Sequence, residues 1–422
     1  MKKTKLNNFK ESIYTEKLSN GLEVYILPLK NKSTFTAMLT VKYGGRDINF
    51  KVNNKNHSTP TGIAHFLEHK MFERKPSPFD FYDKYGLDVN AQTSDDSTIY
   101  YFSGTKCFNK SLIYLLNWIS SLSITESDVK KEQGIILEEA NMYKDNPDSR
   151  LYKEIKSNLY KIDPKQNEVI GTDDDIVAIT KKDLDLCYNT FYNPSNMFLT
   201  IVGDINPKKV IEIVKKESKK LKNNTDKVNR LYGKESDTVK TKSKTIKMNI
   251  GIPKVATAFK MSKNIFKKLN LTEFELIAYI NILMNIGLGM SSDIRSKWLK
   301  ENLFTSSYFN ISTIDSHLAI EFYANSLYPE KLEKELKKYL KDIKISKESF
   351  EREKKTWIAS QIRMMDNPIS MAYSIIENVL DYDSVMPDLI NAIKNLKFEV
   401  LKQVKELCNY ENSVTVKILP KK

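Results

Sequence analysis

The sequence predicts an α+β protein built from two related α+β domains, and three observations lead to that prediction. The chain has 422 residues, whereas a single domain usually holds about 150. Its first half alternates strand-like and helix-like patterns. Its second half repeats the order of helix starts and strands found in the first. Each half is therefore expected to fold around its own core.

Strand and helix patterns alternate over 1–222, the predicted first domain. Asn20-Gly21 lies between two strand patterns, and this dipeptide is a strong hairpin signal. The polar stretch 223–247 that follows this domain is predicted to be an interdomain linker. Further strands are predicted at 34–43, 98–103 and 197–202, and helices at 61–74, 108–121, 126–144, 149–160 and 207–221.

The second domain is predicted at 248–422 because this half repeats two features of the first. A strand is followed by a proline that opens a helix at Pro207 and again at Pro329, and proline suits the first helical turn. Cys187 and Cys408 each precede a tyrosine, an asparagine and an apolar strand. Together the two matches indicate related domains.

Composition favours an ordinary folded protein and argues against nucleic-acid binding. Apolar residues make up 41% and charged residues 28%, which excludes a disordered or collagen-like chain. The formal charge is +14, but only seven of the 67 basic residues are arginine, which is best suited to bidentate phosphate and base contacts. The lysines lie beside acidic residues in patterns such as 331–338, typical of a solvated helix face. A lysine-lined cavity that attracts acidic peptides is the alternative.

The sequence also predicts a cytoplasmic protein without a membrane segment. Its three cysteines are too few and too widely spaced for a disulfide framework or a CxxC zinc site, which favours a reducing compartment. No apolar signal-peptide region follows the basic start of the sequence. The most apolar stretch, 276–290, is shorter than the roughly twenty residues of a membrane span and contains Asn281 and Asn285.

Two of the four histidines occur in one short motif. His65 and His69 enclose Glu68 in the pattern H-x-x-E-H, the inverted zincin motif. On a helix, residues four apart lie on one face, so both imidazoles can reach one metal ion, and Glu68 falls on the same arc. Three polar groups buried on one face are costly without a metal or other partners, so a purely structural helix is the weaker interpretation.

These residue types suit hydrolysis assisted by zinc. Two histidine nitrogens and one carboxylate leave one coordination position open, as in catalytic zinc sites. Zinc would lower the pKa of a water molecule and polarise a substrate carbonyl. Glu68 would take the proton from that water and deliver it to the leaving amine. One zinc ion per chain is predicted.

The third ligand is expected on the helix predicted at 126–144. Glu132 and Glu139 lie seven residues apart and share one face, whereas Glu138 points about 100° away from Glu139. Surface helices often carry such carboxylate pairs. The pattern alone therefore does not decide which carboxylate binds the metal.

Several motifs together resemble the pitrilysin/insulinase family of zinc metallopeptidases, which includes the mitochondrial processing peptidases. The resemblance covers nearly the whole chain and is strongest to the small bacterial type. It implies two α+β domains, each an antiparallel-rich sheet packed with helices, that form half of a clamshell peptidase chamber. Its most specific segments are Asn20-Gly21-Leu22, 62–71, Asn90-Ala91-Gln92-Thr93-Ser94, 132–143 with Asp145-Asn146-Pro147, and Asn193-Pro194-Ser195-Asn196-Met197.

The resemblance also implies roles for residues of this chain. His65, His69 and Glu139 match the zinc ligands of the family. Glu68 matches its catalytic base. Glu132 matches a carboxylate that orients the ligands from behind.

The resemblance further implies where a substrate binds. Asn90 and Ala91 match the edge strand along which family substrates add as an extra β-strand. That mode reads the peptide backbone more than the side chains, which suits short or unfolded polypeptides. The leading hypothesis is therefore a zinc-dependent endopeptidase acting on such substrates.

One departure from the family pattern concerns a substrate-holding Arg and Tyr in the second domain. Trp298 and Thr305 stand near those positions here, although a shifted register would bring in Arg295 or Tyr308. If the pair is missing, another chain has to supply it. The sequence therefore predicts a dimer, with a homologue lacking the zinc motif as one option. The competing hypothesis is a peptide-binding or structural subunit with little activity alone.

Overall fold

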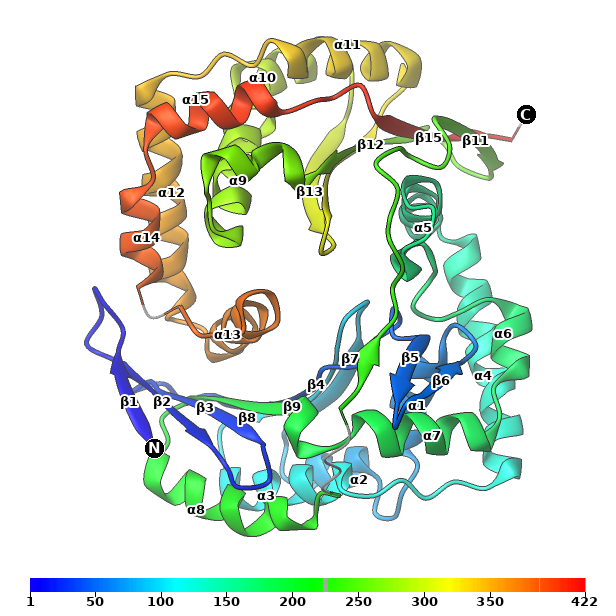
Figure 1. Cartoon of the computed structure of the whole chain (residues 1–422), viewed down its shortest axis with the longest axis vertical. Helices are drawn as coiled ribbons and strands as arrows, with labels where there is room; N and C mark the ends of the chain where they lie inside the picture. Colours follow the sequence, from blue (N-terminus) through cyan, green and yellow to red (C-terminus); the bar gives the residue numbers. More distant parts are fainter. Residues whose placement is uncertain (223–226, 387, 422) are drawn as a thin grey trace. The chain divides into compact units, whose positions relative to one another are not determined.

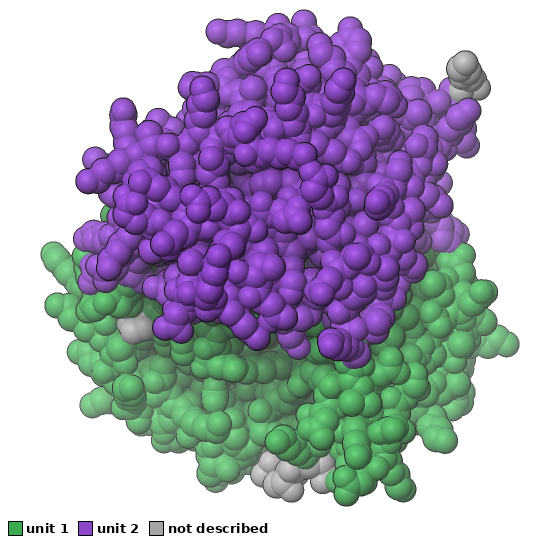
Figure 2. Space-filling model, turned by 45° about the horizontal axis from the view of Figure 1, so that its top comes forward, with its two compact units in different colours: residues 1–140, 167–232, 360–390 green, residues 141–166, 233–359, 391–422 purple. Residues whose placement is uncertain are grey.

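The computed structural model describes residues 1–222, 227–386 and 388–421 (Figure 1). It divides into two compact units, coloured separately in Figure 2. Each unit combines a sheet with helices, so the predicted α+β class is confirmed. Unit 1 is Met1–Ala140, Asn167–Tyr232 and Ser360–Ile390, and unit 2 is Asn141–Gln166, Gly233–Ala359 and Asn391–Lys422.

Unit 1 contains a seven-stranded sheet in the order β1-β2-β3-β9-β4-β8-β7, so β7 is an edge strand. Neighbouring strands are antiparallel except β3 and β9, which are parallel. A smaller sheet has the order β10-β5-β6. The bounds are β1 Lys2–Lys5, β2 Ser12–Lys17, β3 Glu23–Pro28, β4 Phe35–Val41, β5 Asn49–Val52, β6 Lys55–Ser58, β7 Asp88–Thr93, β8 Thr98–Gly104, β9 Met197–Gly203 and β10 Asn229–Arg230.

Helices cover both faces of the large sheet of unit 1. One face packs against α1, α3, α7 and α8 in the main apolar core. The opposite face packs against α13, whose Ala372, Ile375, Ile376 and Val379 follow helical spacing and are buried. The bounds are α1 Ile63–Phe72, α2 Pro78–Asp83, α3 Phe108–Ile119, α4 Glu126–Asp145, α6 Asp173–Ala178, α7 Lys181–Phe191, α8 Pro207–Glu217 and α13 Pro368–Tyr382.

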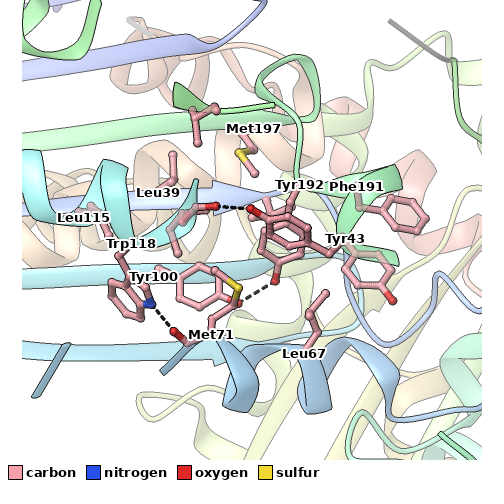
Figure 3. Packing of buried hydrophobic residues seen from close by; sticks show 14 of the residues in the cluster. Leu39, Tyr43, Leu67, Met71, Tyr100, Leu115, Trp118, Phe191, Tyr192 and Met197 are labelled. Carbon is pink, nitrogen blue, oxygen red and sulfur yellow. Dashed lines mark hydrogen bonds between the residues drawn. The ribbon is translucent and has the colours of Figure 1, made fainter. Parts of the chain in front are cut away.

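The core beside α1 is rich in aromatic side chains, and several of their polar atoms form hydrogen bonds (Figure 3). The hydroxyls of Tyr100 and Tyr192 lie 2.7 Å apart, and the indole N–H of Trp118 donates to the Met71 carbonyl at 2.6 Å. The second bond joins α3 to the end of α1. Both bonds satisfy polar groups that would otherwise be costly in the core.

Unit 2 contains a five-stranded sheet in the order β11-β15-β12-β14-β13. Its central strand β12 is buried throughout Val255–Met261, because α5 packs on one face and α11 also contacts the strand. The bounds are β11 Ser243–Met248, β12 Lys254–Ser262, β13 Ser306–Thr313, β14 His317–Asn325, β15 Ser413–Pro420, α5 Pro147–Leu159, α9 Glu273–Leu288, α10 Asp293–Lys300, α11 Pro329–Lys341, α12 Lys347–Met364, α14 Leu389–Asn395 and α15 Phe398–Leu407.

The two units share one topology. The order β3-β9-β4-β8-β7 in unit 1 corresponds to β11-β15-β12-β14-β13 in unit 2, and in both only the first pair is parallel. The helices between these strands follow in the same order. The predicted relation between the two halves is therefore confirmed, and it extends over five strands.

The compact units do not follow the predicted division into 1–222 and 248–422. Helix α5 lies in the first half of the sequence but packs in unit 2, and α13 lies in the second half but packs in unit 1. Each half thus contributes its corresponding helix to the other unit. Both helices follow the same tripeptide, Asp145-Asn146-Pro147 and Asp366-Asn367-Pro368, whose asparagine side chains cap the helix.

Most predicted elements of the first half are present with shifts of a few residues at their ends. The hairpin around Asn20-Gly21 joins β2 and β3, and the helices predicted from apolar spacing correspond to α1, α3, α4, α5 and α8. The apolar stretch 276–290 is largely α9. By length and composition, Glu273–Lys300 could cross a membrane, but 61% of its most apolar window is buried inside the protein, as in a core helix.

The predicted linker 223–247 is partly an integrated segment of unit 2. Residues 223–226 lie outside the described residues, and its end enters β11. Glu235 is buried and accepts hydrogen bonds from the backbone N–H groups of residues 161–163 at 2.7 to 3.0 Å. Its carboxylate also pairs with the buried Lys260 ammonium on β12 at 2.5 Å. This stretch therefore anchors the chain after α5 to the central strand.

Replacing Glu235 should destabilise unit 2. Glu235→Gln leaves the buried Lys260 ammonium without its counter-charge, a change that costs about 3 kcal/mol in comparable buried pairs. The free energy of unfolding from a denaturant titration is the measurement. Glu330→Gln, which removes an exposed partner of Lys417 at 3.7 Å, is the control and should change stability by less than about 1 kcal/mol.

The Glu235 carboxylate should also make the stability of unit 2 sensitive to acid. Burial raises the pKa of Glu235, but the backbone N–H groups and Lys260 outweigh it and lower the pKa to about 2. Its stabilising effect is complete above the ordinary glutamate pKa near 4.5 and is lost as the pH falls towards 2. Stability should therefore fall over that interval, and less steeply in Glu235→Gln. Equal slopes for the two proteins would contradict the assignment.

Candidate metal centre

Helix α1 is fixed at its start by a close contact between two glycines. Gly62 precedes the helix with φ of +87°, a left-handed conformation that favours glycine. A Cβ atom on Gly62 would lie 2.3 Å from the carbonyl oxygen of Ile170, and one on Gly171 would lie 2.5 Å from that of Thr61. The Thr61 hydroxyl also donates to Asp175. These contacts set the position of α1 before the first histidine.

The two histidines of α1 face one carboxylate of α4. Their rings lie on one side of the helix with centroids 4.6 Å apart. Oε2 of Glu139 lies 3.8 Å from Nε2 of His65 and 3.4 Å from Nε2 of His69. Buried Val129, Ile136 and other residues of α4 pack the inner side of that helix in unit 1, which brings Glu139 to the histidines.

These three side chains fit a zinc ion. Their donor atoms all lie within 4.8 Å of one another, and in the described part of the chain they form the one group of three or more suitable side chains. A tetrahedral ion with bonds of about 2.1 Å keeps its ligands about 3.4 Å apart, close to the observed separations. Two imidazoles and one carboxylate also match the donor set of catalytic zinc sites. Their role as ligands stays a prediction.

Glu132 lies behind the histidines rather than among the donors. Its Oε1 atom lies 2.9 Å from Nδ1 of His69, and its Oε2 atom lies 3.2 Å from the ammonium of Lys70. In the neutral ring, an Nδ1–H that donates to Glu132 would leave the lone pair of Nε2 of His69 for a metal ion in place of a proton. The Nδ1 atom of His65 is buried and has no hydrogen-bond partner among the described residues.

The charges around the site favour different protonation of the two histidines. Burial, together with the neighbouring His69, lowers the pKa of His65 to about 4. Burial also lowers the pKa of His69, but hydrogen bonds with Glu132 and Glu139 outweigh this and raise it to about 9. Burial raises the pKa of Glu132, but His69 and Lys70 lower it to about 2, which keeps this carboxylate ionised.

Glu68 is the buried carboxylate beside the histidines. It lies on α1 one residue before His69, and the hydroxyl of Thr93 on β7 donates to its Oε2 atom at 2.5 Å. Burial raises its pKa, and the Thr93 hydrogen bond partly opposes that rise. A carboxylate held in this way has one oxygen engaged and the other available to accept a proton.

The strand predicted to bind substrate, β7, lies at the edge of the seven-stranded sheet of unit 1. Asn90 and Ala91 belong to β7, and the Asn90 side chain accepts a hydrogen bond from the Ala91 backbone at 2.9 Å. Thr93, at the end of the same strand, contacts Glu68. The hydrogen bond between Thr93 and Glu68 therefore connects the edge strand β7 to α1, the helix that carries the two histidines, within unit 1.

The residues considered for the missing Arg/Tyr pair lie in unit 2. Trp298 is buried, so its side chain is part of the core. Thr305 offers a hydroxyl but no cation or phenol. Arg295 donates to the backbone and side chain of Ser307, and Tyr308 is 61% exposed and stacks on Tyr323.

Two contacts of the site were missed by sequence reasoning. Thr93 lies in the segment quoted for the family resemblance, but nothing in its spacing links it to Glu68. Lys70 immediately follows the motif, and its position on the apolar side of a helix was a signal that could have marked it as a residue with a specific role.

The other two histidines have partners away from this site. His57 stacks on Phe50, and His317 lies between Ser316 and Asp237.

Comparison with known proteins identifies the family to which this chain belongs. The model described as insulinase (peptidase family M16) matches residues 30–173, and the model described as the peptidase M16 inactive domain matches residues 178–356. The zinc protease YmfH of Bacillus subtilis is 41% identical over 297 residues, which is 69% of this chain and 69% of that protein. The chain belongs to the M16 insulinase family.

Two further similarities agree with this assignment. The zinc protease PqqE of Helicobacter pylori is 34% identical over 214 residues, which covers 49% of this chain and 46% of that protein. The crystal structure of an M16-like peptidase from Alicyclobacillus acidocaldarius has a TM-score of 0.92 and 27% identity, covering 99% of this chain and 100% of that chain. The resemblance to pitrilysin/insulinase peptidases is confirmed, and zinc protease relatives imply the use of zinc.

The two glycines of the ligand helices make a matched test of this geometry. Gly62→Ala should lower the free energy of unfolding by about 2 kcal/mol and weaken zinc binding, because it combines a left-handed φ with a backbone clash at the start of α1. Gly134→Ala, in exposed open space on α4, should raise stability by about 1 kcal/mol and leave zinc binding unchanged.

Denaturant unfolding and zinc content after dialysis are the measurements for both variants. Normal zinc content together with normal stability in Gly62→Ala would contradict the role given to this contact. Zinc loss in Gly134→Ala would contradict the placement of the α4 ligand.

Proposed function

We propose that this chain is a zinc-dependent endopeptidase that hydrolyses peptide bonds in short or unfolded polypeptides. The observation that supports this most strongly is the convergence of His65, His69 and Glu139 on one point, with Glu68 between the histidines in the sequence. Membership of the M16 family, whose relatives are named zinc proteases, supports the same reaction.

The residues of the site take separate parts in the reaction. Bound by His65, His69 and Glu139, zinc would supply a Lewis acid for the substrate carbonyl and for water. Glu68 accepts the proton of the attacking water and passes it to the nitrogen of the leaving amine. Thr93 holds the carboxylate of Glu68 in place for both transfers.

Substrate binding is proposed along β7. The strand is an edge of its sheet, so an extended peptide can add beside Asn90 and Ala91 through backbone hydrogen bonds. Binding through the backbone requires an extended chain, which short and unfolded polypeptides provide. It also predicts broad tolerance of side-chain identity.

The partner and the cellular location of this chain can be proposed on similar grounds. Family members act on peptides and often pair as heterodimers. We infer a dimer for this chain, in which a homologous subunit supplies the substrate-holding groups that Trp298 and Thr305 do not offer. The three cysteines are unpaired, which supports a reducing, cytoplasmic location.

A peptide-binding subunit with little activity alone is the second candidate. The burial of Trp298 favours it, because that side chain cannot contact a substrate. Incubating the purified chain with a mixed peptide library, with and without a chelator, separates the two functions. Chelator-sensitive cleavage by the single chain would exclude the subunit without activity, and cleavage only after addition of a homologous chain would favour it.

If Glu68 is the general base, its replacement should reduce peptide hydrolysis without releasing zinc. Glu68→Gln should keep its zinc and lose at least about 100-fold in the rate of peptide hydrolysis, because the amide cannot accept the proton from water. Zinc content and cleavage of a fluorogenic peptide are the two measurements. Glu138→Gln, an exposed neighbour of Glu139, is the control and should retain both. Normal hydrolysis by Glu68→Gln would refute the mechanism.

A further inference from the structure

Lys70 is an unusual residue of α1, the helix that carries His65 and His69, because its charged side chain is fully buried. The side chain is 0% exposed, and the residue is among the largest side chains buried in the protein. It follows His69 directly on α1, at a position where an apolar side chain would pack at much lower cost. Burying an ammonium group is unfavourable by several kcal/mol unless its hydrogen bonds are satisfied. A specific set of acceptors is therefore expected.

Three acceptors satisfy the Lys70 ammonium. It contacts the carboxylate of Glu73, the residue just after α1, the backbone carbonyl of Asp128 at 3.1 Å and Oε2 of Glu132 at 3.2 Å. The last two belong to α4. Lys70 therefore uses all three of its N–H groups and joins the two helices that carry the predicted zinc ligands.

Glu132 is held at both of its oxygens as a result. One oxygen contacts the Lys70 ammonium, and the other accepts from Nδ1 of His69 at 2.9 Å. A carboxylate with a single partner can rotate about its terminal bond, whereas one bonded at both oxygens has a fixed plane. The orientation of the His69 ring then depends on that plane.

We propose that Lys70 is a positioning residue for the metal centre, which fixes the Glu132 carboxylate so that His69 presents Nε2 to zinc. The inference rests on the proposed zinc site. Groups that orient a metal-bound histidine from behind typically change metal affinity 10- to 100-fold when they are removed. Lys70 acts one contact further out, through Glu132.

Two other effects of Lys70 predict different results. If the ammonium only repels the metal ion, its removal strengthens zinc binding. If it only fastens α1 to α4, its removal weakens the fold, and zinc affinity recovers whenever stability recovers. Removal of Lys70 and Glu132 together distinguishes these cases, because loss of both members of a buried pair is tolerated better than loss of one.

The test measures zinc dissociation constants by competition with a chromophoric chelator, using the full chain. Lys70→Met and Glu132→Gln should each raise the zinc dissociation constant by about tenfold or more. The double variant should bind zinc no more weakly than Glu132→Gln, even though its metal-free thermal stability exceeds that of Lys70→Met. Glu73→Gln is the matched control, since it removes the charge of another partner of the same ammonium, and should leave zinc affinity unchanged.

Several outcomes would overturn the proposal. Unchanged or tighter zinc binding by Lys70→Met would do so, and so would recovery of wild-type affinity in the double variant. If Lys70→Met does not fold without metal, the comparison of Glu132→Gln with the double variant decides, and additional loss in the double variant contradicts action through Glu132. Wild-type protein that binds no zinc overturns the proposed function itself, whereas normal wild-type binding with a normal Lys70→Met variant overturns this inference alone.

Discussion

The approach of α1 to α4 is the constraint on which the proposed chemistry of this protein depends. Neither helix would hold the proposed zinc ion by itself, because α1 would supply two imidazoles and α4 one carboxylate. Glu132 links the helices through His69 and Lys70, while the glycine contact at Gly62 fixes where α1 begins. Metal–ligand distances tolerate deviations of only about 0.2 Å, so a displacement of one helix against the other would weaken binding of the proposed ion.

Unit 2 shows how the same topology exists without this chemistry. Helices α9 and α10 lie between β12 and β13, as α1 and α2 lie between β4 and β7. In place of the two histidines, α9 carries an almost continuous apolar sequence, and most of it is buried. The fold of the two units is therefore shared, whereas the donor groups belong to unit 1. Architecture alone does not assign function here, and specific side chains do.

The reciprocal placement of α5 and α13 explains why the predicted domain limits do not coincide with compact units. Each helix begins at an Asp-Asn-Pro sequence, so its start is visible in the sequence. The sheet that each helix covers is decided by packing between residues far apart in the chain, which local patterns do not contain. Glu235 is a similar case, since a polar stretch reads as a linker until its partners at 161–163 and Lys260 are known.

The site itself was more predictable than the domain limits. His65, Glu68 and His69 follow from helical spacing, because residues of one helix have a fixed geometry. The choice between Glu132 and Glu139 did not follow, since seven residues on a helix bring both to nearly the same face. The structure separates them by their contacts: Glu139 faces both Nε2 atoms, and Glu132 faces Nδ1 of His69 and the ammonium of Lys70. Family resemblance, not spacing, had indicated that assignment.

The most direct test of the account is to locate the metal. Crystals of protein prepared with zinc would be measured on both sides of the zinc absorption edge. We predict one anomalous peak per chain, bonded to Nε2 of His65, Nε2 of His69 and a Glu139 carboxylate oxygen at about 2.0 to 2.2 Å. A peak at other residues, or no peak in protein that retains its fold, would contradict it.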